Sequence, residues 1–200
     1  MQNDQTPAPE TFTDIIKTSG PLSRLRIAFH TGRYRKVIAL LAPGKVLDIG
    51  CGRPCESLPD QAFLRFLGRP GSVGLDLKRL EGPYEFRQGS VTALPFGDGE
   101  LDNVTAMEIL EHIREVPAAL GEIKRVLKPG GVLIMTTPDN SPLWNLIWGV
   151  WSATVGRMWH HEHLVSYDAG QWRALLEEQF IVTDFKRNWR FDLVFRCVPR

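Results

Sequence analysis

The amino-acid sequence predicts an α/β domain with a doubly wound, seven-stranded, mostly parallel sheet and helices on both faces. Short apolar runs alternate with helix-like segments along most of the chain, which implies parallel strands joined by helical crossovers. Two glycines directly follow the first apolar run, as in a ligand-binding turn. The last two apolar runs are only a few residues apart, too close for a crossover, so we expect an antiparallel C-terminal hairpin.

The bulk properties of the chain are those of one globular domain. It has 200 residues, of which 43% are hydrophobic and 24% are charged, enough for one sizeable core. The net charge of +1 argues against a nucleic-acid partner, and we expect none. The most basic segment carries only a mild cluster, made of Arg24, Arg26, Arg33, Arg35 and Lys36.

Cysteine usage and the N-terminal residues predict a cytoplasmic protein. Cys51, Cys55 and Cys197 are an odd number, which favours reduced thiols over a disulfide framework. The first residues lack the basic-then-apolar pattern of a signal peptide. Residues 1–20 are polar, and we expect a flexible arm there, before a single domain at 21–200.

Apolar spacing places the elements of the parallel part in order. One or two helices are expected between residues 21 and 41, ended by Pro43-Gly44. The predicted parallel strands are 46–49, 73–77, 84–88, 101–106 and 132–136. The predicted helical segments that accompany them are 62–67, 108–112 and 117–127. Residues 128–131, Lys-Pro-Gly-Gly, predict a turn.

The C-terminal segment departs from this alternation. Asp168 can cap a helix that runs to Gln179, and Gln171 three residues later completes a capping box. Residues 180–185 and 189–198 then read as the two strands of the hairpin.

The loop after the first strand predicts a cofactor site. In doubly wound sheets, ligands bind beyond the carboxyl ends of the strands, near the switch in strand order. Gly50 and Gly52 lie just past the first strand, and Asp76 ends the second strand 24 positions after Gly52. An acidic residue at about this spacing hydrogen-bonds a ribose hydroxyl. The pattern therefore indicates a cofactor that contains a nucleoside.

A dinucleotide is disfavoured at this loop. The G-x-G-x-x-G pattern requires glycine at position 55, which is Cys55. Pro54 and Pro59 prevent a helix from starting directly after the glycines, so a pyrophosphate would lose the helix N-terminus that normally holds it. A cofactor without phosphates depends less on that helix N-terminus.

Four segments resemble the class I S-adenosylmethionine-dependent methyltransferases. They are VLDIGCG at 46–52, VGLDL at 73–77, GSVTALPFGDGELDNVTAMEILEHI at 89–113 and EIKRVLKPGGVLIMTTPD at 122–139. They occur in the family's order and spacing, and with the closing hairpin the resemblance covers roughly residues 22–198. It implies a Rossmann-like fold and S-adenosyl-L-methionine as the cofactor.

The resemblance also implies roles for matched residues. The residues that it places around the cofactor are Asp48, Gly50, Cys51, Gly52, Asp76, Leu77, Ser90, Val91 and Met107. The first loop would hold the methionine portion, and Asp76 both ribose hydroxyls. Ser90 and Val91 would flank the adenine, and Met107 would line the methyl-transfer end. A purely architectural Asp48, a structural Asp76 in a turn and a Cys51 packed behind the loop are the alternatives.

Two positions depart from the family's pattern. Pro54 stands where a further glycine is usual, and Ser90 where many members have an acidic residue that contacts the adenine amino group. A serine hydroxyl accepts that bond without a charge. Because Pro54 fixes its φ and lacks an N–H, we expect an extra bend at 53–57.

The bend carries two further expectations. Ser57 can cap a helix that starts about one turn later than usual, with Asp60 at its third position. Arg53 is expected to face the carboxylate of the cofactor.

Glu108, Glu111 and His112 form the first candidate cluster for chemistry. At helical spacing they share a face, and two carboxylates with an imidazole suit a divalent metal. The string MEILEHI resembles the segment of ubiquinone-biosynthesis O-methyltransferases that is associated with a metal. We favour a solvated helix face with a Glu108–His112 pair, predict no metal site, and keep His112 as a candidate catalytic residue.

The second cluster is WHHEHLVSYD at 159–168. In the family, this region borders the acceptor pocket. We expect His161 or His163 to act as a base or to orient the acceptor. A polar loop that anchors the following helix is an equally good interpretation.

An uncharged, tryptophan-rich stretch lies within an insertion at 140–165. Trp144, Trp148 and Trp151 recur at helical spacing, and residues 141–156 carry no charge. This stretch is shorter than the roughly 18 residues that cross a bilayer. We expect a lid over a lipid-like acceptor, or a membrane-surface or homodimer contact through 142–159. Packing on the sheet is the alternative.

The sequence therefore predicts an S-adenosylmethionine-dependent methyltransferase with a small or lipid-like acceptor, methylated at oxygen. The alternative is a non-catalytic member of the fold, a binding or scaffold protein that has lost cofactor affinity at the altered loop. A nucleotide-dependent oxidoreductase is disfavoured, because the loop after the first strand lacks the dinucleotide-binding pattern.

Overall fold

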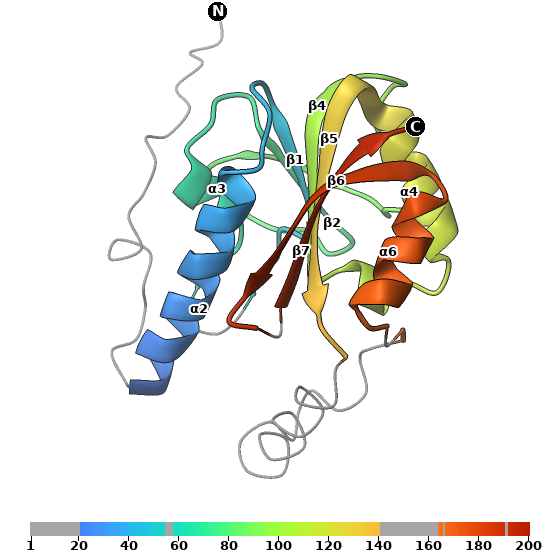
Figure 1. Cartoon of the computed structure of the whole chain (residues 1–200). Helices are drawn as coiled ribbons and strands as arrows, with labels where there is room; N and C mark the ends of the chain where they lie inside the picture. The colour runs from blue at the N-terminus through green and yellow to red at the C-terminus, as the bar shows by residue number, and fades with distance from the viewer. Residues whose placement is uncertain (1–20, 55–57, 141–163, 166, 191) are drawn as a thin grey trace, which may run out of the picture.

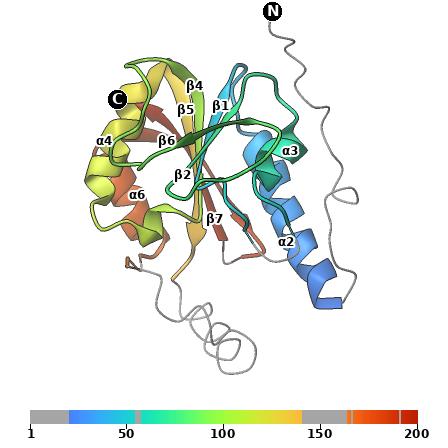
Figure 2. The ribbon, with the colours of Figure 1, turned by 180° about the vertical axis from the view of Figure 1, so that it is seen from behind.

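A computed structural model of the chain describes residues 21–54, 58–140, 164–165, 167–190 and 192–200. Within these residues, one sheet is sandwiched between two pairs of helices (Figure 1). α2 and α3 cover one face, and α4 and α6 cover the other, as the reverse view in Figure 2 also shows. The predicted arm at 1–20 and the tryptophan-rich part of the insertion lie outside the described residues.

The sheet has seven strands in the order β3-β2-β1-β4-β5-β7-β6. The strands are β1 Val46–Ile49, β2 Val73–Asp76, β3 Glu85–Gln88, β4 Leu101–Met107, β5 Leu127–Pro138, β6 Phe180–Asn188 and β7 Asp192–Pro199. The first five are parallel, and β7 runs antiparallel to both β5 and β6. The predicted fold class is confirmed, and the strand order reverses between β1 and β4.

The helices follow the predicted order with two corrections. They are α2 Pro21–Ile38, α3 Ala62–Leu67, the 3-10 helix η1 Leu110–His112, α4 Val116–Val126 and α6 Ala169–Glu177. The capping box is confirmed. The Asp168 side chain accepts bonds from two backbone N–H groups, and the Gln171 side chain accepts a bond from the backbone N–H of Asp168. The helix predicted at 108–112 is wrong at its start, because Glu108 has a left-handed backbone with φ of 55°.

The predicted cap of α3 is also wrong. α3 begins at Ala62 after Gln61, whose backbone is left-handed and whose side chain caps nothing. Ser57 lies outside the described residues, and Asp60 precedes the helix. The side chain of Gln61 instead pairs with both backbone polar groups of Tyr84, at 3.1 Å each, which ties the start of α3 to the segment before β3.

Two apolar clusters hold the layers together. One packs α4 and α6 against the sheet through residues such as Leu120, Ile123 and Trp172, all fully buried. The other packs α2 and α3 against the opposite face through Tyr34 and Phe63. Burial of each such side chain contributes about 1.5–3 kcal/mol to the stability of the fold. The helices are therefore held firmly on both faces of the sheet.

β5 contains the predicted Lys-Pro-Gly-Gly turn. Leu101 of β4 pairs with Leu127, but Asn103 pairs with Val132, so residues 128–131 bulge out of the ladder. Gly130 takes a φ of 79° in this bulge. The pairing then continues without interruption to the carboxyl end of β5, beside the candidate site.

Candidate cofactor site at the switch in strand order

The structure brings the predicted cofactor residues to one edge of the sheet. They lie at or just past the carboxyl ends of four neighbouring strands, from β3 to β4. The residues at this edge are Asp48, Gly50, Cys51, Gly52, Asp76, Leu77, Ser90, Val91 and Met107. Such an edge, at a switch in strand order, is where open α/β sheets bind ligands.

The glycine loop and the end of β2 are joined directly. The backbone N–H of Gly52 donates to Oδ2 of Asp76 at 3.1 Å, and that of Lys78 donates to Oδ1 at 3.0 Å. A Cβ on Gly52 would lie 2.9 Å from the same Oδ2. Glycine at 52 is therefore required for the close approach, and the carboxylate is held at the mouth of the loop.

Gly50 is required by its conformation and by a neighbour. Its φ is 72°, and its N–H donates to the carbonyl of Leu75 at 2.8 Å. A Cβ there would overlap the side chain of Ile109. The loop after β1 and the segment after β4 thus form one continuous wall, in which Ile109 is a contact that the sequence interpretation missed.

Asp48 is buried at the end of β1, with 3% of its surface exposed. Thr105 on β4 donates to its Oδ1 at 2.7 Å. Burial raises its pKa to about 7, against the Thr105 hydrogen bond, which lowers it. A cationic ligand in the loop would favour the ionised form of Asp48. The side chain can therefore change its protonation when such a ligand binds, as well as support the loop.

Cys51 packs behind the loop, as its alternative interpretation proposed. It is 3% exposed, and a Cβ on Gly74 of β2 would lie 2.6 Å from its sulfur. Its side chain is therefore a packing group, and burial raises the pKa of its thiol. Only its backbone faces the loop: its carbonyl accepts from Gln61 N–H at 2.7 Å.

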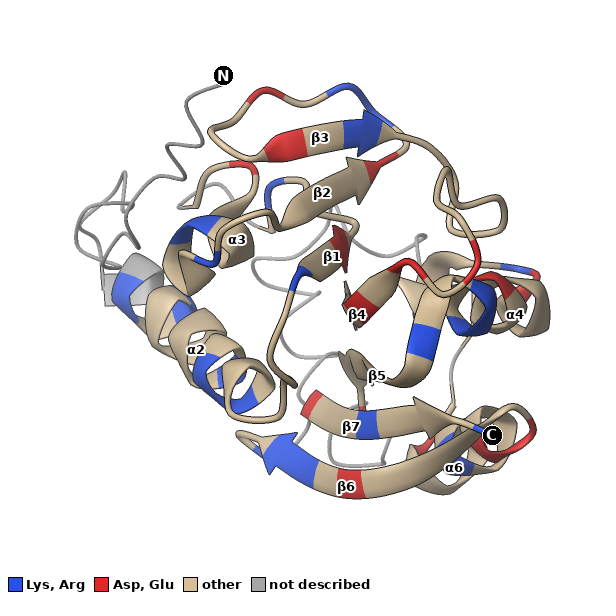
Figure 3. Cartoon of the chain, turned by 90° about the horizontal axis from the view of Figure 1, so that it is seen from above, with Lys and Arg blue, Asp and Glu red and all other residues tan. Residues whose placement is uncertain are grey.

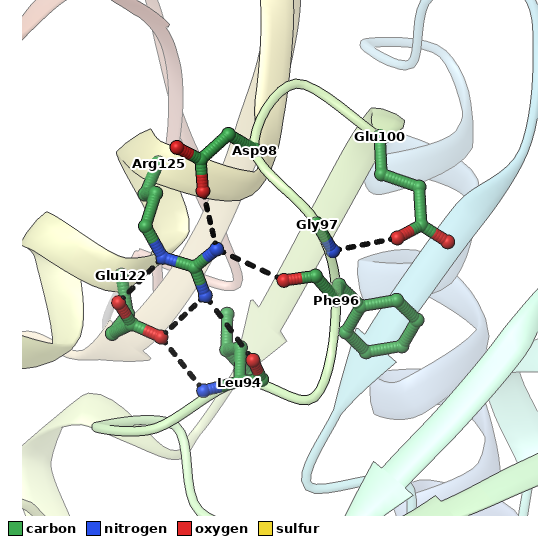
Figure 4. A network of polar contacts seen from close by, with 7 residues as sticks. All are labelled: Leu94, Phe96, Gly97, Asp98, Glu100, Glu122 and Arg125. Carbon is green, nitrogen blue, oxygen red and sulfur yellow. Dashed lines mark hydrogen bonds and ion pairs between the residues drawn. The ribbon is translucent and has the colours of Figure 1, made fainter.

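The segment after β3 is held in place by α4 (Figure 4). Glu122 accepts a bond from the N–H of Leu94 at 2.8 Å, and Arg125 donates to the carbonyls of Leu94 and Phe96. Arg125 also pairs with Glu122 and Asp98, both at 2.7 Å. This network anchors the loop that carries the predicted adenine-flanking residues, and the i, i+3 spacing of Glu122 and Arg125 was its only sequence signal.

Ser90 and Val91 lie at the start of that loop. The hydroxyl of Ser90 is within 2.8 Å of Thr92 Oγ1 and accepts from the Thr92 N–H at 3.2 Å. Val91 is 4% exposed. Thr92 therefore orients the serine that replaces the usual acidic residue.

Beyond β4, a buried arginine joins three elements. Arg33 of α2 pairs with Glu108 at 3.3 Å and with Asp192 at the start of β7 at 2.9 Å. Glu108 also accepts from Thr136 of β5 at 2.9 Å. The two carboxylates raise the pKa of Arg33 despite its burial. Sequence reasoning placed Arg33 only in a basic cluster and missed Asp192.

The three residues considered for a metal are not arranged to hold one. Glu108 faces Arg33, whereas Glu111 is 2% exposed and neither of its carboxylate oxygens has a hydrogen-bond partner. Burial, followed by the charge of Glu108, raises the pKa of Glu111 well above its ordinary value. Within the described part of the chain, no group of three His, Cys, Asp or Glu side chains could hold a metal ion. His112 lies in η1, and His161 and His163 lie outside the described residues.

The strand order, the glycine loop and the carboxylate at the end of β2 together define a class I methyltransferase fold. The family model described as "Methyltransferase domain" matches residues 47–135. Over these residues the chain is similar to methyltransferases.

Curated relatives with named activities match much of the chain. A 2-phytyl-1,4-naphtoquinone methyltransferase from Synechocystis is 30% identical over 74% of this chain and 64% of its own length. A demethylmenaquinone methyltransferase from Renibacterium salmoninarum is 36% identical over 68% of this chain and 56% of its own. A ubiquinone biosynthesis O-methyltransferase from Xanthomonas oryzae is 33% identical over 51% and 46%. The chain thus spans less than two thirds of each relative.

Solved structures share the fold at low sequence identity. A protein from Pyrococcus horikoshii superposes with a TM-score of 0.64 at 19% identity, covering 91% of this chain and 93% of that one. A 1,6-didemethyltoxoflavin-N1-methyltransferase from Burkholderia thailandensis, with S-adenosylhomocysteine bound, gives 0.62 at 19% identity and covers 92% of each chain.

Proposed function

We propose that this chain binds S-adenosyl-L-methionine at the edge formed by β1, β2, β3 and β4. The pairing of Gly52 with Asp76 carries the proposal, because it sets a carboxylate with free lone pairs at the mouth of a glycine loop. Asp76 accepts one N–H on each oxygen, and each oxygen has capacity for a further bond from a ribose hydroxyl. Asp48 and the loop would hold the methionine portion, and Ser90 and Val91 would flank the adenine.

The same geometry supports methyl transfer. The sulfonium is already a reactive donor, so the protein mainly aligns the acceptor, methyl carbon and sulfur and excludes water. Bound at this edge, S-adenosylmethionine would supply the methyl group and keep the electron pair of the broken sulfur–carbon bond, and a base beside the acceptor would take the hydroxyl proton. Met107 would line the transfer point, and His112, His161 or His163 would supply the base.

We propose an apolar, quinone-like acceptor that is methylated at oxygen. Relatives named for naphthoquinone, menaquinone and ubiquinone biosynthesis support a ring-containing acceptor. The insertion at 140–165 would close over it as a lid, or contact a membrane or a second subunit through 142–159. None of the described helices is long and apolar enough to span a membrane.

A transfer assay tests this function. The chain is incubated with S-adenosylmethionine labelled in its methyl group and with hydroxylated aromatic acceptors that have or lack an isoprenoid tail. We expect label in the tailed acceptors, and loss of transfer in Asp76→Asn. Glu178→Gln, which removes the same charge from an exposed site just after α6, should retain transfer. Absence of transfer together with absence of S-adenosylmethionine binding would favour the scaffold alternative.

A further inference from the structure

Positive charge is concentrated on α2. The helix has five basic residues and no acidic residue over Pro21–Ile38, and Figure 3 shows blue segments along its length. The net charge of the whole chain is only +1, so the remainder of the chain is net acidic. An asymmetry of this kind attracts a negatively charged partner to one side of a molecule.

Part of this charge is free to face a partner. Arg24 and Arg35 are exposed, and their separation of eleven residues places them on one face of the helix, about three turns apart. Arg190, in the turn between β6 and β7, is also exposed. Arg33 and Lys36 differ, because they bond to Asp192 and Asn188 in the adjoining hairpin.

Apolar side chains of α2 and of the turn are exposed as well. Leu25 is 48% exposed and Trp189 is 41% exposed. The ring of Phe29 lies edge-on to Trp189, with centroids 5.7 Å apart, and Leu25 is one helical turn before Phe29. These residues form what we name the α2–hairpin surface: Arg24, Leu25, Phe29, Trp189 and Arg190.

The surface lies beside the carboxyl edge of the sheet. β7 begins at Asp192, which pairs with Pro138 at the end of β5, so the turn at 189–190 flanks the same edge as the candidate site. Figures 1 and 2 show the first half of α2 and this turn projecting together past the ends of the parallel strands.

We propose that the α2–hairpin surface docks on a bilayer that contains anionic lipids. Arginines at the phosphate level gain from the negative surface potential. Tryptophan favours the interface between headgroups and acyl chains, and an exposed leucine can enter it. A nucleic acid would satisfy the arginines but would leave Leu25 in water, which is why the bilayer fits the surface better.

Docking in this orientation would turn the open edge of the sheet towards the membrane. A lipid-like acceptor could then reach the site without crossing water. This consequence rests on the proposed function, whereas the docking itself does not.

Co-sedimentation of the full chain with vesicles tests the docking. One set of vesicles is phosphatidylcholine alone, and the other includes phosphatidylglycerol. We expect binding to the anionic vesicles only, and its loss when high salt screens the charges. Because each basic residue near such a surface strengthens binding about fivefold, Arg24→Glu with Arg190→Glu should weaken it by more than about twentyfold. Leu25→Gln should weaken it by about fivefold.

A matched variant separates this surface from net charge. Lys45→Glu with Lys124→Glu reverses two positive charges as well, just before β1 and on α4, away from the surface, and should bind anionic vesicles like the unmodified chain. Thermal melting confirms that each variant is folded. Failure of the unmodified chain to bind anionic vesicles would overturn the proposal, as would equal loss in both double variants. Binding to an RNA oligonucleotide, without vesicle binding, would assign the surface to nucleic acid instead. Cofactor binding is tested separately, by titrating the chain with S-adenosylhomocysteine. The docking and the proposed function can therefore fail independently.

Discussion

The backbone N–H of Gly52 donates to Oδ2 of Asp76 at 3.1 Å, across 24 positions of the sequence. This bond joins the loop after β1 to the end of β2 and leaves no room for a side chain on Gly52. The proposed cofactor site depends on this edge of the sheet.

Substitution of Gly52 by alanine tests the close approach. The new Cβ would lie 2.9 Å from Asp76 Oδ2, so the carboxylate must shift away from the position in which it would meet a ribose. We expect Gly52→Ala to weaken S-adenosylhomocysteine binding by at least about tenfold, which is about 1.4 kcal/mol. Gly121→Ala on α4, where a Cβ would meet nothing closer than 3.6 Å, is the control. Equal affinity in both variants would contradict the assignment.

The buried carboxyl of Asp48 predicts a pH-dependent stability. Its pKa is raised from 3.8 to about 7 in the folded chain, so between these values the folded state holds a proton that the unfolded chain has released. Its contribution to stability is therefore present at low pH and is lost as the pH rises through about 7. Asp48→Asn cannot ionise, so its Tm relative to the unmodified chain should improve from pH 5 to pH 8. A constant difference, or one that worsens, would contradict this account.

Arg33 predicts a large and specific loss of stability. Arg33→Met leaves Glu108 and Asp192 without their counter-charge at a buried site. Breaking a buried pair in this way costs about 3–5 kcal/mol, measurable by urea unfolding, and Arg33→Lys should restore part of it. Arg35→Met, two residues along the same helix but exposed, should change stability by no more than about 0.5 kcal/mol. Equal changes in the free energy of unfolding for Arg33→Met and Arg35→Met would contradict a stabilising role for the buried ion pairs.

Arg125 predicts a local effect on the loop after β3. It donates to the carbonyls of Leu94 and Phe96 and aligns Glu122 with the N–H of Leu94. Arg125→Met should speed hydrogen exchange at Leu94 and lower the affinity for S-adenosylhomocysteine, because this loop follows Ser90 and Val91. Lys124→Met, on the same helix, should leave both unchanged. Unaltered exchange in Arg125→Met would show that other contacts hold the loop.

Much of the fold could be predicted because its signals are local. Apolar runs such as 46–49 and the short link between the last two strands define the parallel and antiparallel parts of the sheet. The cap at Asp168 needs only its neighbour Gln171. Gly50, Gly52 and Asp76 were found for a similar reason, since parallel strands bring their carboxyl ends to one edge, whereas the other candidate cofactor residues followed from the family resemblance.

Other features depend on contacts between distant residues or on unusual backbone. The pairing of Arg33 with Asp192 spans 159 positions and leaves no pattern in the sequence. The segment after Met107 looks helical by spacing, but Glu108 adopts a left-handed backbone and its carboxylate accepts from Thr136. The Glu108 carboxylate therefore pairs with Arg33 and does not share a helix face with Glu111 and His112.

The most direct test of the central claim is calorimetric titration of the full chain with S-adenosylhomocysteine, with NAD titrated in parallel. We predict one saturable site for S-adenosylhomocysteine, no binding of NAD, and at least about tenfold weaker S-adenosylhomocysteine binding by Asp76→Asn. Binding of NAD in place of S-adenosylhomocysteine, or undiminished affinity in Asp76→Asn, would contradict the cofactor site described above.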